Sequence, residues 1–224
     1  MTKHPLHDTC TWVFDLDNTL YAPHHALFDQ IDVRMGEYIA NLLNLDMVEA
    51  KRVQKDYFFT YGTTLNGLIH HHDIDPHTFL EYVHDIDLGA IPADDVLHKA
   101  LELLPGDKLV YTNGSAEHAR RVLAKLEITD HFMGIYDVAA ADFVPKPERS
   151  AYEVMITQYE LDASSCVMVE DMARNLEPAF ELGMKTVWCP TESEWSGKGA
   201  DSSYIDYVVD DLPDWLLGVA LSCK

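Results

Sequence analysis

The sequence predicts an α/β protein with a doubly wound parallel sheet and an all-helical domain inserted after the first strand. Short apolar runs alternate with amphipathic segments, which is typical of strand–helix–strand units. The runs are apolar throughout rather than at every second residue, as expected for strands that are buried on both faces. Between the first two runs, from about Pro23 to Asp94, we find helical periodicity and no strand pattern. Such a stretch is far longer than an ordinary connection, so it must have a fold of its own.

Each expected strand ends at acidic, polar or glycine-containing residues. The expected strands are Thr11–Phe14, Lys108–Tyr111, Ile135–Val138, Val167–Val169 and Thr186–Cys189, with a late strand in Ile205–Val209. The segments between them that have a helix-forming composition are Ser115–Leu126, Glu148–Tyr159 and Asn175–Leu182. Gly183 follows the last segment, at the position where glycine commonly ends a helix.

The insertion has its own helical pattern. Apolar residues recur at helical spacing at its start, at Leu27, Ile31, Met35, Ile39 and Leu43. Asp46–Tyr61 and Pro76–Asp85 are further expected helices, and Gly62 and Gly67 interrupt the pattern between them. Pro23 at one end, and Gly89 with Pro92 at the other, are the expected hinges. We therefore expect residues 21–94 to form the inserted domain and residues 1–20 and 95–224 to form the α/β core.

Composition narrows the classes of function. The chain has 224 residues, with 16 Lys and Arg against 38 Asp and Glu, a formal net charge of −22. Because nucleic-acid binding depends on Lys and Arg contacts to phosphate, we expect no nucleic-acid partner. No apolar run approaches the length of a membrane span, so we expect no membrane association either. The first ten residues contain no apolar core and the four cysteines form no C-x-x-C pair, which predicts a cytoplasmic protein with reduced thiols.

The candidate site lies where the expected strands end. In an open α/β sheet, ligands bind outside the carboxyl ends of the strands. These ends carry Asp15 and Asp17, then Thr112-Asn113-Gly114, then Lys146 between two prolines, and then Glu170-Asp171. Carboxylates grouped on one edge repel each other unless a cation lies among them. Oxygen ligands without clustered His or Cys favour Mg²⁺ over zinc or copper.

Each of these residues also has a structural explanation when it is taken alone. Asp15 and Asp17 could be turn residues, with the next two residues capping a helix, although a carboxylate directly after an apolar strand is costly without a role. Thr112-Asn113-Gly114 could be a plain turn, and Lys146 a solvated loop lysine. Glu170-Asp171 could be the N-cap of the next helix. It is their combination that favours a functional site.

In combination, the residues resemble the motifs of the haloacid dehalogenase superfamily of phosphatases. Asp15-Leu16-Asp17-Asn18-Thr19-Leu20 resembles its first motif, Thr112 its second, Lys146 its third and Glu170-Asp171 its fourth. The four occur in the expected order and strand positions, so the resemblance covers roughly Trp12 to Pro190. It implies a Rossmann-like core with a helical cap and a magnesium-dependent hydrolase that acts on phosphate monoesters.

The resemblance also implies individual roles. Asp15 would attack phosphorus to form an aspartyl-phosphate, and Asp17 would protonate the leaving oxygen and later activate water. Mg²⁺ would be held by Asp15, the backbone carbonyl of Asp17 and Asp171, with Glu170 as a further contributor. The Thr112 hydroxyl, the N–H groups of Asn113 and Gly114, and Lys146 would bind the phosphoryl oxygens.

Two segments resemble the pyrimidine 5′-nucleotidase branch of this superfamily. They are Tyr61–Leu65 with Gly67-Leu68, and Glu170–Leu176, where Met172 replaces an expected small polar residue. This resemblance suggests a nucleoside 5′-monophosphate, UMP or CMP, contacted by Tyr61, Thr63, Thr64 or Asn66, although these residues could equally be a helix N-cap and packing residues. The oligomeric state is not predicted.

Other functions remain open. A phosphatase for sugar phosphates or phosphoglycolate would use the same core. A haloacid dehalogenase would share Asp15 but has no use for Asp17, and a non-enzymatic Mg²⁺-binding interaction protein would have no reason to keep the whole set.

Outside the motifs, we interpret His70-His71-His72, His77 and His84 as a surface cluster rather than a metal site, because adjacent helical residues point in different directions.

Overall fold

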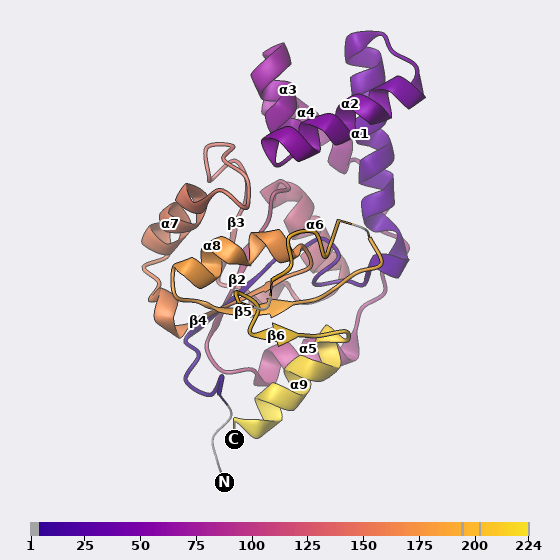
Figure 1. Ribbon diagram of the computed structural model, residues 1–224. Coiled ribbons are helices and arrows are strands. Elements are labelled where there is room, and N and C mark those ends of the chain that lie inside the picture. Colours follow the sequence, from indigo (N-terminus) through magenta and orange to yellow (C-terminus); the bar gives the residue numbers. More distant parts are fainter. Residues whose placement is uncertain (1–4, 194, 202, 224) are drawn as a thin grey trace.

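The computed structural model describes residues 5–193, 195–201 and 203–223, and its centre is a sheet of six parallel strands (Figure 1). The opening residues, from which we expect no secretory signal, lie partly outside this range. The strand order is β3-β2-β1-β4-β5-β6, which is that of a doubly wound fold. The strands are β1 (Thr11–Phe14), β2 (Asp107–Tyr111), β3 (Gly134–Tyr136), β4 (Cys166–Glu170), β5 (Lys185–Trp188) and β6 (Tyr207–Val208). The predicted fold class is therefore confirmed.

Helices cover both faces of the sheet. Because successive residues of a strand point to opposite faces, neighbouring residues of one strand belong to different buried clusters. Trp12 and Phe14 of β1 belong to one buried cluster and Val13 to a second. The first cluster includes residues of α5 (Asp95–Leu103), α6 (Ala116–Lys125) and α9 (Leu212–Ser222). The second includes residues of α7 (Arg149–Gln158) and α8 (Glu177–Glu181). Strands buried on both faces account for their continuous apolar sequences.

Four helices form the segment between β1 and α5: α1 (Leu27–Leu43), α2 (Met47–Tyr61), α3 (Thr64–His72) and α4 (Pro76–His84). The long α1 leads away from the sheet toward α2, α3 and α4, which lie beyond the carboxyl ends of the strands (Figure 1). Asp46, Thr63 and Asp75 accept hydrogen bonds from backbone N–H groups at the starts of α2, α3 and α4. These caps explain where each helix begins.

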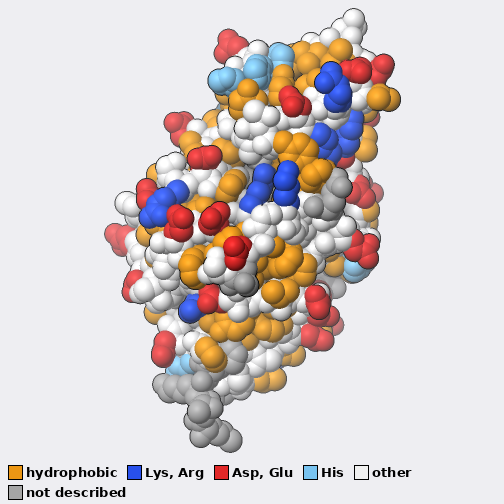
Figure 2. Space-filling view, viewed as in Figure 1, with side chains coloured by type: hydrophobic (Ala, Val, Ile, Leu, Met, Phe, Trp, Pro, Cys, Tyr) orange, Lys and Arg blue, Asp and Glu red, His pale blue; other side chains and the backbone are white. Residues whose placement is uncertain are grey.

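Side chains of the core contact the end of α2. The Arg174 guanidinium lies 4.5 Å from the centre of the Phe58 ring, and its Nη2 donates to the carbonyl of Gly62 over 3.0 Å. The Lys198 ammonium lies 4.5 Å from the centre of the Phe59 ring. Figure 2 shows Lys and Arg side chains grouped near this junction of the helical segment and the core. The helical segment therefore rests on the core through cation–π contacts as well as through the buried cluster.

The structure corrects several predicted boundaries. Gly67 does not interrupt a helix: it lies inside α3, where a Cβ atom would come within 2.4 Å of the Tyr57 side chain, so the glycine lets α2 and α3 pack closely. The helix expected over Asn175–Leu182 covers only Glu177–Glu181 and follows a 3-10 turn, Ala173–Asn175. Helix α9 was not predicted, because its sequence is apolar on more than one face. No helix in the described part of the chain has the length and apolarity needed to cross a membrane.

Candidate active site

Three carboxylates meet at the carboxyl edge of the sheet. Strand β1 pairs with β4 so that Phe14 lies opposite Val169, and the N–H of Asp15 donates to the Val169 carbonyl over 2.9 Å. This register places Asp15 beside Glu170 and Asp171. One carboxylate oxygen from each of the three residues lies within 4.8 Å of the others, and all three side chains are buried. The distance between Asp15 and Asp171 is thus short enough for one ion to bind both.

Lys146 lies among these acids. Its ammonium donates to Asp15 Oδ1 and Glu170 Oε2, both over 2.7 Å, and to the Tyr111 carbonyl over 2.9 Å. Only 1% of the residue is exposed. Asn113 holds its backbone, because Asn113 Oδ1 accepts the Lys146 N–H over 2.8 Å and Asn113 Nδ2 donates to the Lys146 carbonyl over 3.2 Å. Lys146 is therefore a buried member of the site rather than a solvated loop lysine.

The site has more negative charge than its one lysine can balance. Burial raises the pKa of Asp15 from 3.8 to about 7, and the charge of Glu170 adds to this rise while Lys146 opposes it. Burial, followed by the charges of Glu170 and Asp15, raises the pKa of Asp171 well above its ordinary value. Carboxylates that cannot all ionise together form a site for a further cation. Because the donors are oxygens, the residues fit Mg²⁺, and Asp15 and Asp171 are the side chains that would hold it.

Both carboxylate oxygens of Glu170 already have donors, as do those of Asp15, whose Oδ2 accepts from Thr19 Oγ1 over 3.1 Å. Glu170 Oε2 accepts from Lys146, whereas its Oε1 accepts from Asn175 Nδ2 over 2.9 Å and from the Met172 N–H over 3.2 Å. Glu170 thus orients Lys146 and closes the turn that follows β4. The carbonyl of Asp171 accepts from Ser196 Oγ over 2.6 Å and from Trp188 Nε1 over 2.9 Å, which fixes the backbone of the next carboxylate.

Asp17 lies in a different environment from Asp15. Its Oδ1 accepts from the Tyr21 hydroxyl over 2.7 Å and contacts His118 Nε2 at 2.8 Å. Burial alone would raise the pKa of Asp17, but His118 and the Tyr21 hydrogen bond outweigh burial and lower it. Sequence reasoning missed both partners. Tyr21 could have been noticed four residues after Asp17, but nothing in the sequence marks His118, which is 101 residues away.

The turn after β2 is partly occupied by its own hydrogen bonds. The Gly114 N–H donates to Thr112 Oγ1 over 2.9 Å, and Ser115 Oγ accepts the His118 N–H at the start of α6. Gly114 was expected to present its N–H to a phosphoryl oxygen, and in this structure that N–H is engaged within the turn. Thr112 is buried at the end of β2, and the Asn113 side chain holds Lys146. The turn therefore braces Lys146 as well as bordering the site.

The residues expected to contact a nucleoside are hydrogen-bonded to one another or to residues of α2 and α3. Thr63 Oγ1 accepts the Asn66 N–H over 3.1 Å, and Asn66 Nδ2 donates to the Tyr61 carbonyl over 2.9 Å. Thr64 Oγ1 donates to the Gln54 carbonyl, and the Tyr61 hydroxyl contacts His71 Nε2 at 2.6 Å. These contacts match the alternative of a helix cap and packing residues.

The predicted histidine surface cluster is only partly correct. His70, His71 and His77 are exposed, but His84 is buried and its ring stacks on that of His118, with centroids 4.3 Å apart. Burial, with the nearby His118, lowers the pKa of His84 to about 3. His84 therefore belongs with the environment of Asp17 rather than with the other histidines.

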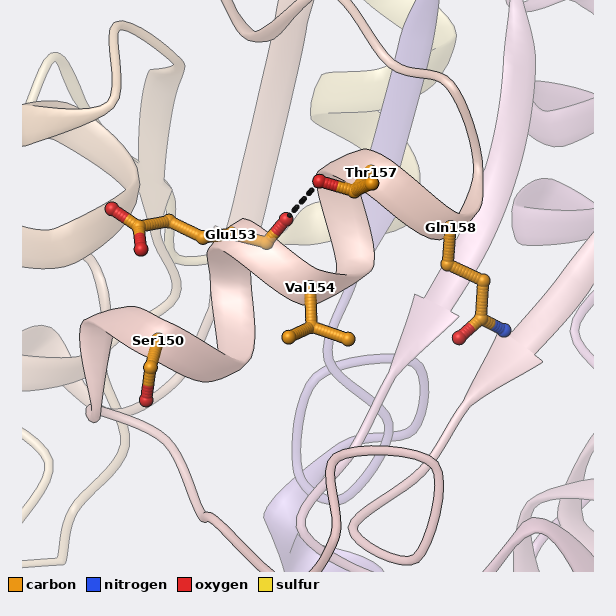
Figure 3. A pocket seen from close by; sticks show the side chains of 5 residues that line it. All are labelled: Ser150, Glu153, Val154, Thr157 and Gln158. Atoms are coloured by element: carbon orange, nitrogen blue, oxygen red, sulfur yellow. Dashed lines mark hydrogen bonds between the residues drawn. The ribbon is translucent and has the colours of Figure 1, made fainter.

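Two hollows lie outside the acidic site. One is an open hollow along the outer side of α7, lined by residues of that helix alone, among them Ser150, Val154 and Gln158 (Figure 3). The other lies between α4 and the start of α6, where His84, Ser115 and His118 contribute to its lining. The charge arrangement around Asp15, and not the depth of a hollow, identifies the candidate active site.

Comparisons with known proteins agree with this geometry. Residues 11–183 match the family described as haloacid dehalogenase-like hydrolase. The chain is 30% identical over 190 residues to Phosphate metabolism protein 8 of Saccharomyces cerevisiae, a match that covers 76% of this chain and 58% of the yeast protein. The chain thus spans less than two thirds of the length of this relative.

Solved structures show the same fold. A HAD phosphatase from Thermococcus onnurineus has a TM-score of 0.61 at 16% identity, covering 92% of this chain and 95% of that one. L-2-haloacid dehalogenase from Xanthobacter autotrophicus has a TM-score of 0.58 at 16% identity, covering 93% and 97%. At such low identity these similarities establish the fold alone, and phosphatases and dehalogenases share it. The matched family covers most of the chain, and we conclude that this protein belongs to the haloacid dehalogenase-like hydrolases.

Proposed function

We propose that the protein is a magnesium-dependent hydrolase of small phosphate monoesters that acts through an aspartyl-phosphate. One observation carries this proposal: at the carboxyl ends of the central strands, carboxylate oxygens of Asp15, Glu170 and Asp171 lie within 4.8 Å of one another, and a buried lysine pairs with two of these acids, Asp15 and Glu170. A phosphate monoester needs an in-line nucleophile, positive charge around its oxygens and a proton for the leaving alkoxide. The site offers a group for each of these needs.

The chemistry begins with Asp15. A carboxylate oxygen of Asp15 forms a bond to phosphorus while the bond from phosphorus to the leaving oxygen breaks, which gives an aspartyl-phosphate and an alcohol. Lys146 orients Asp15 and offers positive charge near the phosphoryl group. When bound between Asp15 and Asp171, Mg²⁺ would offset the repulsion between carboxylate and phosphate. Water then attacks the aspartyl-phosphate and releases inorganic phosphate.

Asp17 is the group that we assign to proton transfer. Its carboxyl gives a proton to the leaving oxygen and later takes one from the attacking water. The lowered pKa of Asp17 means that it is ionised before substrate arrives, and the negative charge of a bound phosphate then favours its protonation. A second acid at this position distinguishes a phosphatase from a dehalogenase, which forms its ester without protonating a leaving halide. The name of the yeast relative, Phosphate metabolism protein 8, supports the same choice.

For the substrate, we propose a pyrimidine nucleoside 5′-monophosphate, UMP or CMP. The support is the resemblance of Tyr61–Leu65 and Glu170–Leu176 to the pyrimidine 5′-nucleotidase branch. Because the side chains of Thr63, Thr64 and Asn66 are occupied locally, recognition of the base would have to come from other groups lining the site. A sugar phosphate or phosphoglycolate is the alternative substrate.

A panel of phosphate monoesters, assayed for phosphate release with Mg²⁺ and with EDTA, tests this proposal. It should contain UMP, CMP, AMP, glucose 6-phosphate, glycerol 3-phosphate and phosphoglycolate. We expect release that requires Mg²⁺ and a higher kcat/KM for UMP and CMP than for the others. Equal rates on all compounds would reject the pyrimidine assignment, activity in EDTA would reject the metal, and no release from any compound would reject the phosphatase.

A further inference from the structure

The side chain of Asp17 is held through one of its two carboxylate oxygens. The Tyr21 hydroxyl donates to Oδ1 over 2.7 Å, and His118 Nε2 lies 2.8 Å from the same atom. An ionised carboxylate can only accept, so His118 Nε2 must carry the hydrogen of this bond. Within the described part of the chain, no side chain hydrogen-bonds to Oδ2 of Asp17. The two oxygens are therefore not equivalent, because Oδ1 is anchored and Oδ2 is left to react.

His118 is itself fixed in place. It lies in the first turn of α6, where its N–H donates to the capping Ser115 Oγ over 3.2 Å, and its side chain has no exposed surface. Its Nδ1 is buried without a hydrogen-bond partner among the described residues. Among the described residues, the bond from Nε2 to Asp17 is therefore the one hydrogen bond that the His118 ring makes. A buried ring nitrogen left without a partner is costly, so packing alone would be better served by an apolar side chain.

A second histidine fixes the ring of His118. His84, the last residue of α4, stacks on it with an angle of 7° between the ring planes. His84 is held in turn by Ser115 Oγ, 3.0 Å from its Nδ1, and by Arg121, whose Nη1 donates to the His84 carbonyl over 2.8 Å. Residues of α4 and α6 thus meet behind Asp17. Through this stack, helix α4 contributes to the environment of Asp17.

Resting on the phosphatase function proposed above, we propose that His118 is a positioning residue: braced by His84 and together with Tyr21, it holds Oδ1 of Asp17 so that Oδ2 delivers the proton to the leaving oxygen. Two donors on Oδ1 leave Oδ2 as the oxygen able to carry the proton of the protonated acid. As the bond between phosphorus and the leaving oxygen breaks, that oxygen takes the proton from Oδ2, and Asp17 returns to the carboxylate. His118 neither gains nor loses a proton in this step.

The dependence on the leaving group tests this role. An alkoxide such as the 5′-oxygen of UMP needs a proton in order to leave, whereas p-nitrophenolate is a stable anion that leaves without one. We expect His118→Leu to lower kcat on UMP, or on the best alkyl monoester of the panel, by about 10–100-fold, since general acid catalysis is worth about 10²–10⁴. The fall on p-nitrophenyl phosphate should be at least about tenfold smaller, with KM little changed.

Three further variants keep the test decisive. His118→Gln keeps an N–H donor near the position of Nε2, so it should recover much of the rate on the alkyl ester. Tyr21→Phe removes the other donor and should show the same selective loss, which covers the case in which His118→Leu does not fold. Asp17→Asn removes the general acid itself, so we expect it to give the largest fall in kcat on the alkyl ester relative to p-nitrophenyl phosphate. Thermal unfolding with and without Mg²⁺ checks each variant for folding and metal binding.

The outcomes separate this inference from the function on which it rests. Equal losses on the alkyl and p-nitrophenyl esters in both His118→Leu and Tyr21→Phe would overturn the positioning role while leaving the phosphatase in place. Unchanged rates in both variants would overturn it as well. Absence of Mg²⁺-dependent hydrolysis by the wild-type protein would instead reject the phosphatase itself.

Discussion

The carboxyl edge of the sheet and the start of α3 both contain residues that the sequence marks as functional, but they differ in how their polar groups are used. At the sheet edge, Asp15 and Asp171 are buried beside other acids, and their pKa values are raised. At the start of α3, Thr63 and Asn66 satisfy each other and the local backbone. The first arrangement carries negative charge that a further cation would balance, whereas the second is explained as a helix cap without a ligand.

This difference shows how far a motif can be interpreted from residue types alone. A buried carboxylate without sufficient positive charge costs free energy in the folded protein, so its presence indicates a function. A threonine before a helix stabilises that helix and needs no other explanation. Three predictions test the contrast, the first at Asp15 for activity, the second at Asp15 for stability and the third at Thr63.

The largest expected effect is on catalysis. Asp15→Asn removes the nucleophile while keeping nearly the same shape, so kcat on any substrate of the panel should fall at least about 10³-fold. Circular dichroism and thermal unfolding should show a folded protein. Glu153→Gln, which changes an exposed carboxylate on α7 (Figure 3), is the matched control and should keep the wild-type rate. Mg²⁺-dependent turnover by Asp15→Asn would show that another group is the nucleophile.

The same variant tests the charge imbalance through stability. Because the pKa of Asp15 is about 7 in the folded protein and 3.8 as its ordinary value, the folded state binds this proton more tightly than the unfolded chain. The contribution of Asp15 to the free energy of unfolding therefore falls as pH rises from about 4 to about 7. Urea unfolding in EDTA should show Asp15→Asn gaining stability relative to the wild type across this window, by roughly 2–4 kcal/mol.

Comparing the two proteins at each pH cancels the contributions of titrating groups that they share to the free energy of unfolding. One such group is His84, whose lowered pKa makes the free energy of unfolding rise with pH over the same range. Saturating Mg²⁺ should reduce the difference between the two proteins by stabilising the wild type, by about 2.7 kcal/mol at a concentration 100 times Kd, and should stabilise the variant less. A difference in stability that does not change with pH would contradict the raised pKa of Asp15.

The smallest expected effect is at the start of α3. Thr63→Ala removes the N-cap and should lower the free energy of unfolding by about 1 kcal/mol, with kcat/KM on UMP changed less than about twofold. Asp75→Ala, which removes the cap of α4, is the matched control for the loss of a cap. A loss of kcat/KM in Thr63→Ala but not in Asp75→Ala would show that Thr63 contributes to substrate binding and is not only a helix cap.

Much of the fold was predictable because it depends on local patterns. Continuous apolar runs predicted β1, β2, β4 and β5 to within a residue or two, since strands buried on both faces have no polar alternation. Gly67 was misinterpreted, because the residue that it accommodates, Tyr57, lies on a different helix. The sequence of α9 gives no clear signal for a different reason: its buried residues, Leu212, Leu216, Val219 and Ala220, form one face, but apolar residues such as the exposed Leu221 also lie outside that face.

For the candidate site, residue order alone predicts Asp15, Asp17, Lys146 and Asp171, because an acidic residue after a buried strand and a set of motifs in fixed order are visible without a fold; the structure brings Asp15, Lys146 and Asp171 together. Folding decided how these groups are used. Glu170 became a brace for Lys146, and His118 reached Asp17 from 101 residues away. The physical reason is that burial and hydrogen-bond partners, which set the pKa and the orientation of a carboxyl group, arise only when distant segments pack together.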